Sequence, residues 1–118
     1  MIIGIGTDIL NQERVEALYI KYKKKFPSKI LSSEELNYFN KLKHKSKVNF
    51  LCSSFCAKEA FVKALGTGFR SLYPSQITYS KNEIGAPSLE YVKRNNFKIH
   101  LSISNSDRYT QSFIVLEQ

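Results

Sequence analysis

Two acids and a lysine are the residues of this chain whose types and spacing could support chemistry. Asp8 ends an apolar, strand-like segment in which Gly4 and Gly6 would let other backbone or a ligand approach closely. Glu59 and Lys63 are four residues apart in a predicted helix, so their side chains are neighbours on its surface. The helix therefore carries either an ordinary salt bridge or one wall of a phosphate-binding site.

The surroundings of Glu59 and Lys63 leave both interpretations open. An exposed pair of this kind stabilises a helix by only about 0.3 kcal/mol. The neighbouring residues, however, are mostly apolar: Phe55, Cys56, Ala57, Ala60, Phe61, Val62, Ala64 and Leu65. A carboxylate in such a helix needs a partner charge or a metal ion to offset its desolvation. For Asp8, the alternative to a functional role is that of a helix-capping acid.

The segment GIGTDI, residues 4–9, also invites comparison with a dinucleotide-binding loop. The fingerprint G-x-G-x-x-G requires a third glycine, but Ile9 occupies that position. Two glycines alone are weak support for a nucleotide fold, and the dinucleotide hypothesis is set aside.

Near the C-terminus, apolar and polar residues alternate with the period of a strand. One face would carry Ile99, Leu101 and Ile103, and the other His100, Ser102 and Ser104. A polar face with a histidine could line a cleft, or it could be a solvated face of a sheet.

Periodicity, capping signals and turn residues predict the elements that must position these side chains. They are a strand over 3–9, a helix capped by Asn11 and stopped by Pro27, a helix from the capping box at 32–35 to about Leu42, a long helix over about 47–65 closed by Gly66 and Gly68, and strands over 77–81, 88–91, 98–104 and 109–117. We expect an α+β fold in which a small, mainly antiparallel sheet packs around the long helix. A length of 118 residues favours a single domain spanning 1–118.

Composition narrows the cellular setting and the class of partner. No run approaches the ~18 apolar residues of a membrane span, and the N-terminus lacks the basic region of a signal peptide, so we expect a cytoplasmic protein. Cys52 and Cys56, the only cysteines, are predicted to be buried and reduced because no histidine pair accompanies them in a zinc-site pattern. A net charge of +8 favours an acidic partner without identifying it.

Three segments together resemble a known family. The strand GIGTDI, the helix FCAKEAFVKALGTG and the strand HLSIS leading into YTQSFIVLE occur in an order and at separations similar to those of holo-acyl-carrier-protein synthase, the small bacterial class of 4′-phosphopantetheinyl transferase. The resemblance extends over nearly the whole chain. It favours the phosphate-site interpretation of Glu59 and Lys63.

The resemblance implies a reaction and a set of site residues. The reaction is Mg²⁺-dependent transfer of phosphopantetheine from coenzyme A to a serine of apo-acyl carrier protein, with release of adenosine 3′,5′-bisphosphate, in support of fatty acid biosynthesis. Asp8 and Glu59 match the family's metal-binding pair, and Lys63 matches its pyrophosphate-contacting lysine. Coenzyme A binding is further expected to involve Lys45, Lys47, Gly66, Gly68, Pro87 and His100.

The resemblance also implies partners. The family forms a homotrimer with active sites between subunits, and it docks an acidic helix of the carrier protein on its first helix. Arg14 matches a position of that docking surface. If the first helix continues to Phe26, Lys21 and Lys24 lie on the same stripe as Arg14, with Leu18 as an apolar contact.

Two positions depart from the family's pattern. The motif H-x-S-I-S-H usually ends in a second histidine, but Asn105 stands there and cannot act as a general base. A metal-bound water, a carboxylate or a phosphate oxygen is then left to accept the serine proton, and the role of His100 stays open. Ser54 occupies a position where the family often has arginine, and Lys45 and Lys47 could supply charge near the 3′-phosphate of the coenzyme instead.

Three alternatives compete with this interpretation. The basic charge and the aromatic residues would suit a nucleic-acid-binding module, but Asp8 and Glu59 would repel phosphate unless a metal ion intervened, and no nucleic-acid-binding motif is present. The chain could also modify another carrier protein, or it could be a weakly active copy because of Asn105. We expect neither nucleic acid nor membrane among its partners.

Overall fold

A computed structural model describes residues 1–70, 72–91, 93 and 96–118. Its elements, in chain order, are β1 (Ile2–Asn11), α1 (Gln12–Tyr22), α2 (Lys25–Ile30), α3 (Ser33–Phe39), α4 (His44–Leu65), a single 3-10 turn (Pro74–Gln76), β2 (Ile77–Lys81), β3 (Pro87–Tyr91), β4 (Lys98–Asn105) and β5 (Tyr109–Glu117). Among the helices that the structure describes, none combines the length and the apolar character needed to cross a membrane.

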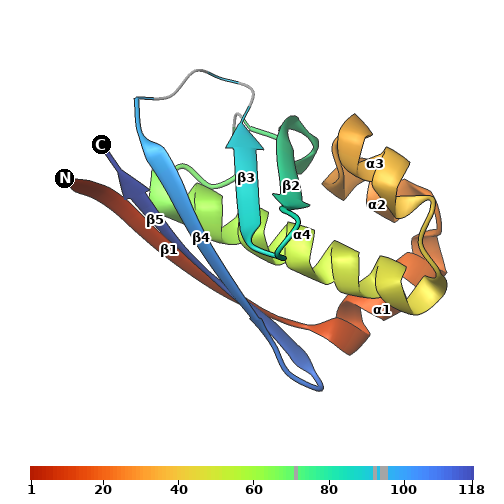
Figure 1. The fold of residues 1–118 in the computed structure, drawn as a ribbon. Coiled ribbons are helices and arrows are strands. Elements are labelled where there is room, and N and C mark those ends of the chain that lie inside the picture. Colours follow the sequence, from red (N-terminus) through yellow and green to blue (C-terminus); the bar gives the residue numbers. More distant parts are fainter. Residues whose placement is uncertain (71, 92, 94–95) are drawn as a thin grey trace.

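The strands form two antiparallel sheets, where one was expected. The larger sheet has the order β1-β5-β4, and β2 pairs with β3 in a separate hairpin. The long helix α4 runs along the inner face of the larger sheet and passes beneath the hairpin, while α1, α2 and α3 gather around its N-terminal half (Figure 1). The α+β prediction, with antiparallel strands around one long helix, is confirmed.

The backbone of α4 lies almost directly on the backbone of β1. A Cβ atom added to Gly4 would meet the carbonyl oxygen of Ala64 at 2.2 Å, and one added to Gly6 would meet that of Ala60 at 2.0 Å. Real Cβ atoms do not come this close to backbone oxygens, so only glycine permits the contact. The expectation that these glycines allow close approach is confirmed, and the group that approaches is the helix backbone.

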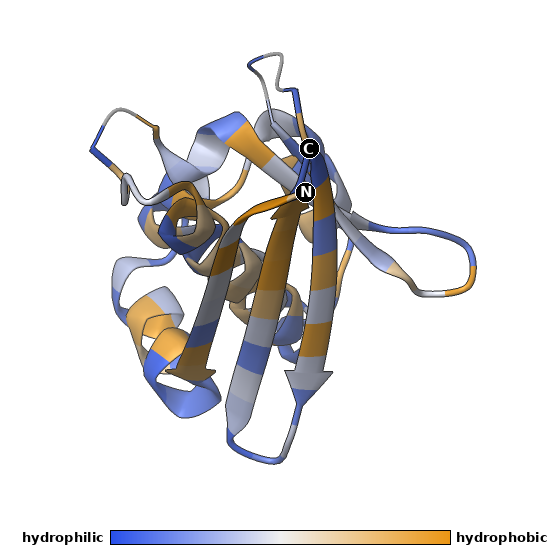
Figure 2. Ribbon diagram, turned by 90° about the vertical axis from the view of Figure 1, so that its left-hand side faces the viewer, coloured by the Kyte–Doolittle hydropathy of each residue, from blue (hydrophilic) through white to orange (hydrophobic). Residues whose placement is uncertain are grey.

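The two faces of the larger sheet have different environments. On β5, alternate residues Thr110, Ser112, Ile114 and Leu116 are buried against α4. The outer face lies in front of the helices in Figure 2 and carries exposed apolar residues on β1 and β5, including Ile5, Ile9 and Phe113. The outer face of the sheet therefore carries apolar side chains on β1 and β5 that no described residue of the chain covers.

A buried ion pair ties α2 and α3 to the middle of α4. Lys58 Nζ, with no exposed side-chain surface, donates to Glu35 Oε1 at 2.5 Å and to the carbonyl oxygen of Ile30 at 2.7 Å. Ser54 donates its hydroxyl to the other oxygen of Glu35. Burial lowers the pKa of Lys58, and the Glu35 carboxylate opposes this effect. The capping box predicted at the start of α3, Ser32 with Glu35, is confirmed.

The first helix is shorter than predicted, and Pro27 does not stop it. α1 ends at Tyr22, where Lys23 takes a positive φ of 50°. Pro27 instead occupies the third position of α2. The first backbone N–H groups of a helix have no intrahelical partner, so proline costs no hydrogen bond there. Because no glycine marks Lys23 as a helix end, the sequence pattern does not predict the break at this position.

The long helix begins at His44, three residues before the predicted start. Its N-cap, Lys43, makes no side-chain cap, and the first turn is basic, which opposes the helix dipole. Tertiary contacts compensate: His44 Nε2 lies 3.0 Å from Glu16 Oε2 and its ring stacks on Tyr19. The predicted end at Leu65, with Gly66 in the left-handed conformation, is confirmed.

We expect Gly6→Ala to lower the melting temperature strongly, since overpacking at a backbone contact costs about 1–3 kcal/mol or more. Thermal unfolding followed by circular dichroism measures the change. Because the obstructing atom is the carbonyl oxygen of Ala60, adding Ala60→Gly should not restore stability. Recovery in the double variant would show that the methyl group of Ala60 is the obstacle instead.

Candidate active site

Asp8 and Lys63 meet across the β1–α4 contact. Asp8 pairs with Ser112 in the sheet and shares its inward-facing side. Lys63 Nζ donates to Asp8 Oδ1 and to the backbone oxygen of Thr7, both at 3.0 Å. The hypothesis that Lys63 forms an ordinary salt bridge with Glu59 is therefore wrong. Lys63 pairs instead with Asp8, which lies 55 positions away in the sequence.

The helix-capping interpretation of Asp8 is also wrong. Asn11 caps α1, as predicted, because its Oδ1 accepts from the backbone N–H groups of Glu13 and Arg14 at 2.9 and 3.2 Å. The carboxylate of Asp8 is left to interact with the side chains of α4.

Glu59 is a half-buried carboxylate with no hydrogen bond or salt bridge to any residue that the structure describes. Burial raises its pKa, the nearby carboxylate of Asp8 raises it further, and Lys63 lowers it. Two carboxylates thus share a partly buried region with a single lysine. Such an arrangement favours an additional cation, because the like charges otherwise repel.

The oxygen donors of this site fit a Mg²⁺ ion that would take most of its coordinating oxygens from phosphate and water. The described residues contain no cluster of three or more His, Cys, Asp or Glu side chains that could hold a metal ion alone. Mg²⁺ is commonly held by one or two carboxylates together with phosphate oxygens and water. Asp8 and Glu59 can supply the carboxylates of that arrangement.

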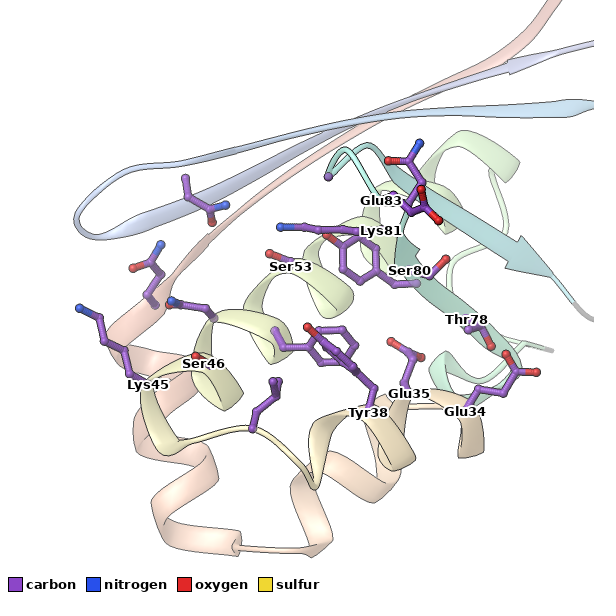
Figure 3. Close-up of a pocket in the computed structure, with 18 of the residues that line it drawn as sticks. Glu34, Glu35, Tyr38, Lys45, Ser46, Ser53, Thr78, Ser80, Lys81 and Glu83 are labelled. Atoms are coloured by element: carbon purple, nitrogen blue, oxygen red, sulfur yellow. The ribbon is translucent and has the colours of Figure 1, made fainter.

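A cavity of about 1070 Å³ opens beside the N-terminal half of α4. Its walls come from α3, α4, β2, the turn between β2 and β3, and the turn between β4 and β5 (Figure 3). Lys45 stands at one end, and Lys81 projects from the wall formed by β2. Asp8, Glu59 and Lys63 are not part of its lining, so a single chain keeps the carboxylate pair and the cavity apart.

The remaining residues expected at the coenzyme site are scattered over one chain. Lys47 places its ammonium 5.3 Å from the ring centre of Phe39. Pro87 opens β3 next to the turn at the cavity wall. Gly66 and Gly68 end α4 far from Lys45, and both have positive φ values.

His100 lies on the opposite face of the sheet from Asp8. It pairs with Val115 on the outer face, and its Nε2 is 2.9 Å from Glu117 Oε1. The hydrogen bond and charge of His100 lower the pKa of Glu117. The polar face of β4 is thus exposed to solvent in the isolated chain, and its side chains point away from Asp8.

Sequence reasoning missed most of the polar residues of the cavity wall, including Asn49, Ser53 and Lys81. Asn49 and Ser53 line the cavity together with Lys45. The three positions are separated by four residues each, a spacing that places them on one face of α4 and that the sequence already contained. Lys81 was missed because nothing in the strand 77–81 distinguishes a cavity wall from a solvated edge.

Ser54 and the two cysteines are interior residues of α4. The side chain of Ser54 is fully buried and bonded to Glu35, so this position faces the interior of the fold and not the cavity. The two cysteines are buried and free, as predicted. Burial raises the pKa of Cys52 to about 11 and that of Cys56 to about 12, which keeps both thiols protonated and unreactive.

The predicted basic stripe is only partly assembled. Arg14 and Lys21 are exposed on α1, and Leu18 between them is half-buried. Lys24 lies beyond the end of α1, after the break at Lys23, so its predicted helical alignment with Arg14 is wrong.

We expect Asp8→Asn to lower the pKa of Glu59, since it removes a neighbouring negative charge, and Lys63→Met to raise it. Carboxyl carbon chemical shifts followed through a pH titration by NMR measure both changes without any metal or substrate. Asp107→Asn and Lys47→Met are the matched controls and should leave the titration of Glu59 unchanged. Equal effects of test and control variants would contradict the carboxylate pair.

Comparison with known proteins agrees with this geometry. Residues 4–114 match the model of the 4′-phosphopantetheinyl transferase superfamily. The holo-[acyl-carrier-protein] synthase of Oceanobacillus iheyensis is 40% identical over 117 residues, covering 99% of this chain and 98% of that protein. The crystal structure of the synthase from Neisseria meningitidis matches with a TM-score of 0.91 at 34% identity and covers 100% of both chains. The synthase from Bacillus anthracis, in complex with CoA (3′,5′-ADP), matches with a TM-score of 0.88 at 34% identity over 100% of this chain and 98% of that one. The chain belongs to the 4′-phosphopantetheinyl transferase superfamily and, within it, to the holo-[acyl-carrier-protein] synthases.

Proposed function

We propose that this protein transfers the 4′-phosphopantetheine group of coenzyme A to a serine of an apo-acyl carrier protein, with Mg²⁺ as its cofactor. The serine oxygen forms a bond to the phosphorus that carries pantetheine, and the bond from that phosphorus to the bridging oxygen breaks. Adenosine 3′,5′-bisphosphate leaves, and the serine proton is released. The observation that carries the proposal is the meeting of Asp8, Glu59 and Lys63 where α4 crosses β1.

Each of the three residues has a defined task in this reaction. Asp8 and Glu59 would hold the Mg²⁺ ion, which neutralises negative charge on the pyrophosphate when it is bound. Lys63 is pre-positioned by Asp8 and by the backbone oxygen of Thr7, so its ammonium can contact a phosphate oxygen with little loss of freedom. Phosphoryl transfer relies mainly on such positioning and on charge neutralisation.

A complete site requires a second copy of the chain in this proposal. Lys45 lines a cavity that excludes Asp8, and His100 lies on the other face of the sheet. A homotrimer with sites between subunits would bring such separated residues together. The outer sheet face suits an interface, because the apolar residues Ile5 and Ile9 are 61% and 65% exposed there. A single domain over residues 1–118 would supply both halves of each site.

The nucleotide half of coenzyme A is assigned to the cavity. Its volume of about 1070 Å³ is ample for a nucleotide, and Lys45 and Lys81 provide positive charge. Gly85 lines the cavity, and Pro87 follows it at the start of β3, next to the cavity wall. Free, reduced cysteines are consistent with the expected cytoplasmic setting, where an acyl carrier protein would serve fatty acid biosynthesis.

The test of the proposed function is incubation with coenzyme A, Mg²⁺ and apo-acyl carrier protein, followed by mass spectrometry of the carrier. We expect the mass of phosphopantetheine to be added. Glu59→Gln keeps the side-chain volume and removes the charge, so transfer at low Mg²⁺ should fall about 100-fold, the scale of effects seen at metal sites.

Glu90→Gln, an equivalent change of an exposed residue on β3, is the control and should transfer normally. Absence of product with the parent protein would overturn the proposed function. Normal transfer by Glu59→Gln at low Mg²⁺ would overturn the metal assignment alone.

Carrier docking is proposed to be electrostatic and separable from coenzyme binding. Arg14 and Lys21 are exposed on α1, and an acidic carrier helix would meet them with Leu18 as an apolar contact. Lys24 can contribute from the segment that follows, although not as part of the same helix. Exposed charges of this kind mainly set association rates and are screened over ~8 Å at physiological salt.

The double reversal of Arg14 and Lys21 to Glu should reduce the rate of carrier modification at low salt at least about tenfold, because steering is lost. Coenzyme A affinity, measured by calorimetry, should stay unchanged, and added salt should mimic the variant in the parent protein. Reversal of Lys29 and Lys41 changes the net charge equally away from α1 and should have a smaller effect. A matching fall in coenzyme A affinity would place the stripe in the nucleotide site.

A further inference from the structure

The strand residue opposite Asp8 is hydrogen-bonded to the long helix. Ser112 of β5 pairs with Asp8 of β1 in the larger sheet, and it is only 1% exposed. Its hydroxyl donates to the carbonyl oxygen of Cys56 at 2.7 Å. The same carbonyl oxygen accepts the helical N–H of Ala60. Ser112 therefore binds the backbone of α4 one turn before the position where Ala60 meets Gly6.

The side chain of Cys56 adds weaker interactions at the same place. Its Sγ lies 3.2 Å from Ser112 Oγ and 3.4 Å from the backbone oxygens of Asp8 and Thr110. A thiol has a single, weakly donated proton, so these three acceptors share it. The main attraction between helix and sheet at this point is therefore the hydrogen bond from the Ser112 hydroxyl to the carbonyl oxygen of Cys56.

Hydrogen bonds also connect Ser112 with Lys63. The hydroxyl of Thr7 donates to the backbone oxygen of Ser112 at 2.9 Å, and Lys63 Nζ donates to the backbone oxygen of Thr7 at 3.0 Å. The hydroxyl and the carbonyl group of Ser112 thus join β5 to both elements of the charged site. One is the helix that carries Glu59 and Lys63, and the other is the strand that carries Asp8.

The separation of Asp8 and Glu59 depends on contacts between two elements, because one residue lies on β1 and the other on α4. Mg²⁺ requires near-ideal octahedral geometry, so a small displacement of the helix would weaken its coordination. Gly4 and Gly6 let the helix approach the strand closely, but they supply no directional attraction. A hydrogen bond has a preferred length and direction, so it limits sliding of the helix along the sheet.

We propose that Ser112 is a positioning residue of the active site, whose hydroxyl holds α4 where Glu59 and Asp8 can coordinate one Mg²⁺ ion. This inference rests on the proposed function. Ser112 contacts neither metal nor substrate, since its hydroxyl proton is donated to Cys56 and its side chain is buried against α4. A hydroxyl that only satisfied a buried polar group would contribute to stability without a selective effect on metal binding.

Binding of Mn²⁺, a paramagnetic substitute for Mg²⁺, tests the inference. Electron paramagnetic resonance measures it in the protein saturated with coenzyme A, without carrier protein and without turnover. Ser112→Ala removes the hydroxyl, and we expect the Mn²⁺ affinity to fall about tenfold, as for other groups that orient metal ligands.

Ser54→Ala is the matched control, because it removes another fully buried hydroxyl from the core, one that donates to Glu35. Hydrogen bonds to charged groups are the stronger ones, so this variant should lower the melting temperature at least as much as Ser112→Ala does. Its Mn²⁺ affinity should equal that of the parent.

Two further variants identify the groups involved. Cys56→Ala keeps the carbonyl oxygen that accepts from Ser112 and loses only the thiol contacts, so its Mn²⁺ affinity should stay within about twofold of the parent. In a Glu59→Gln background, Ser112→Ala should cause no further loss of Mn²⁺ affinity, because the carboxylate that it positions is already absent.

The outcomes separate the inference from the function on which it rests. A folded parent that binds neither coenzyme A nor Mn²⁺ would overturn the proposed function and the inference with it. A parent that binds both, with unchanged Mn²⁺ affinity in Ser112→Ala, would overturn the role of Ser112 alone. Equal losses of affinity in Ser112→Ala and Ser54→Ala, or a further loss in the Glu59→Gln background, would also overturn that role.

Discussion

The direct contact between the backbones of α4 and β1 is the constraint on which the rest of this structure depends. Gly4 and Gly6 leave room for the carbonyl oxygens of Ala64 and Ala60, which a Cβ atom would approach to 2.2 and 2.0 Å. Asp8 follows at the next inward-facing position of the same strand. On the helix, Glu59 and Lys63 each precede one of the two contacting alanines. The contact that packs the helix therefore also sets the separation of the three charged groups.

The repulsion between the carboxylates of Asp8 and Glu59 is opposed by the contacts that hold α4 in place. Desolvation and the carboxylate of Asp8 both raise the pKa of Glu59, and the ammonium of Lys63 offsets only part of this effect. Lys58, the residue before Glu59, is held on a different side of α4 by Glu35 and the carbonyl oxygen of Ile30. Removing one partner of such a buried pair is strongly destabilising, so rotation of α4 that would separate the carboxylates is resisted.

Patterns of local origin could be predicted from the sequence, and interactions of tertiary origin could not. The strands 77–81 and 109–117, the Ser32 capping box and the end of α4 at Gly66 follow from residues within a few positions of one another. The start of α4 at His44 depends on contacts with Glu16 and Tyr19 of α1, which are distant in the sequence. The break at Lys23, where φ is positive, carries no glycine signal. Lys63 illustrates the difference, because its nearest acid along the helix is Glu59 but its partner in space is Asp8.

The period of a β-strand links the two tasks assigned to β1. Asp8 faces inward toward α4, whereas Ile5 and Ile9 face outward on the exposed apolar side. In the proposed assembly, the outward residues meet another subunit while the inward residue serves the chemistry. A shift of one residue in the pairing of β1 with β5 would exchange these two sets of side chains. It would also drive Ile5 and Thr7 against the backbone of α4, where only glycine fits. The helix contact thus fixes the register of β1, and with it both the site and the surface available for assembly.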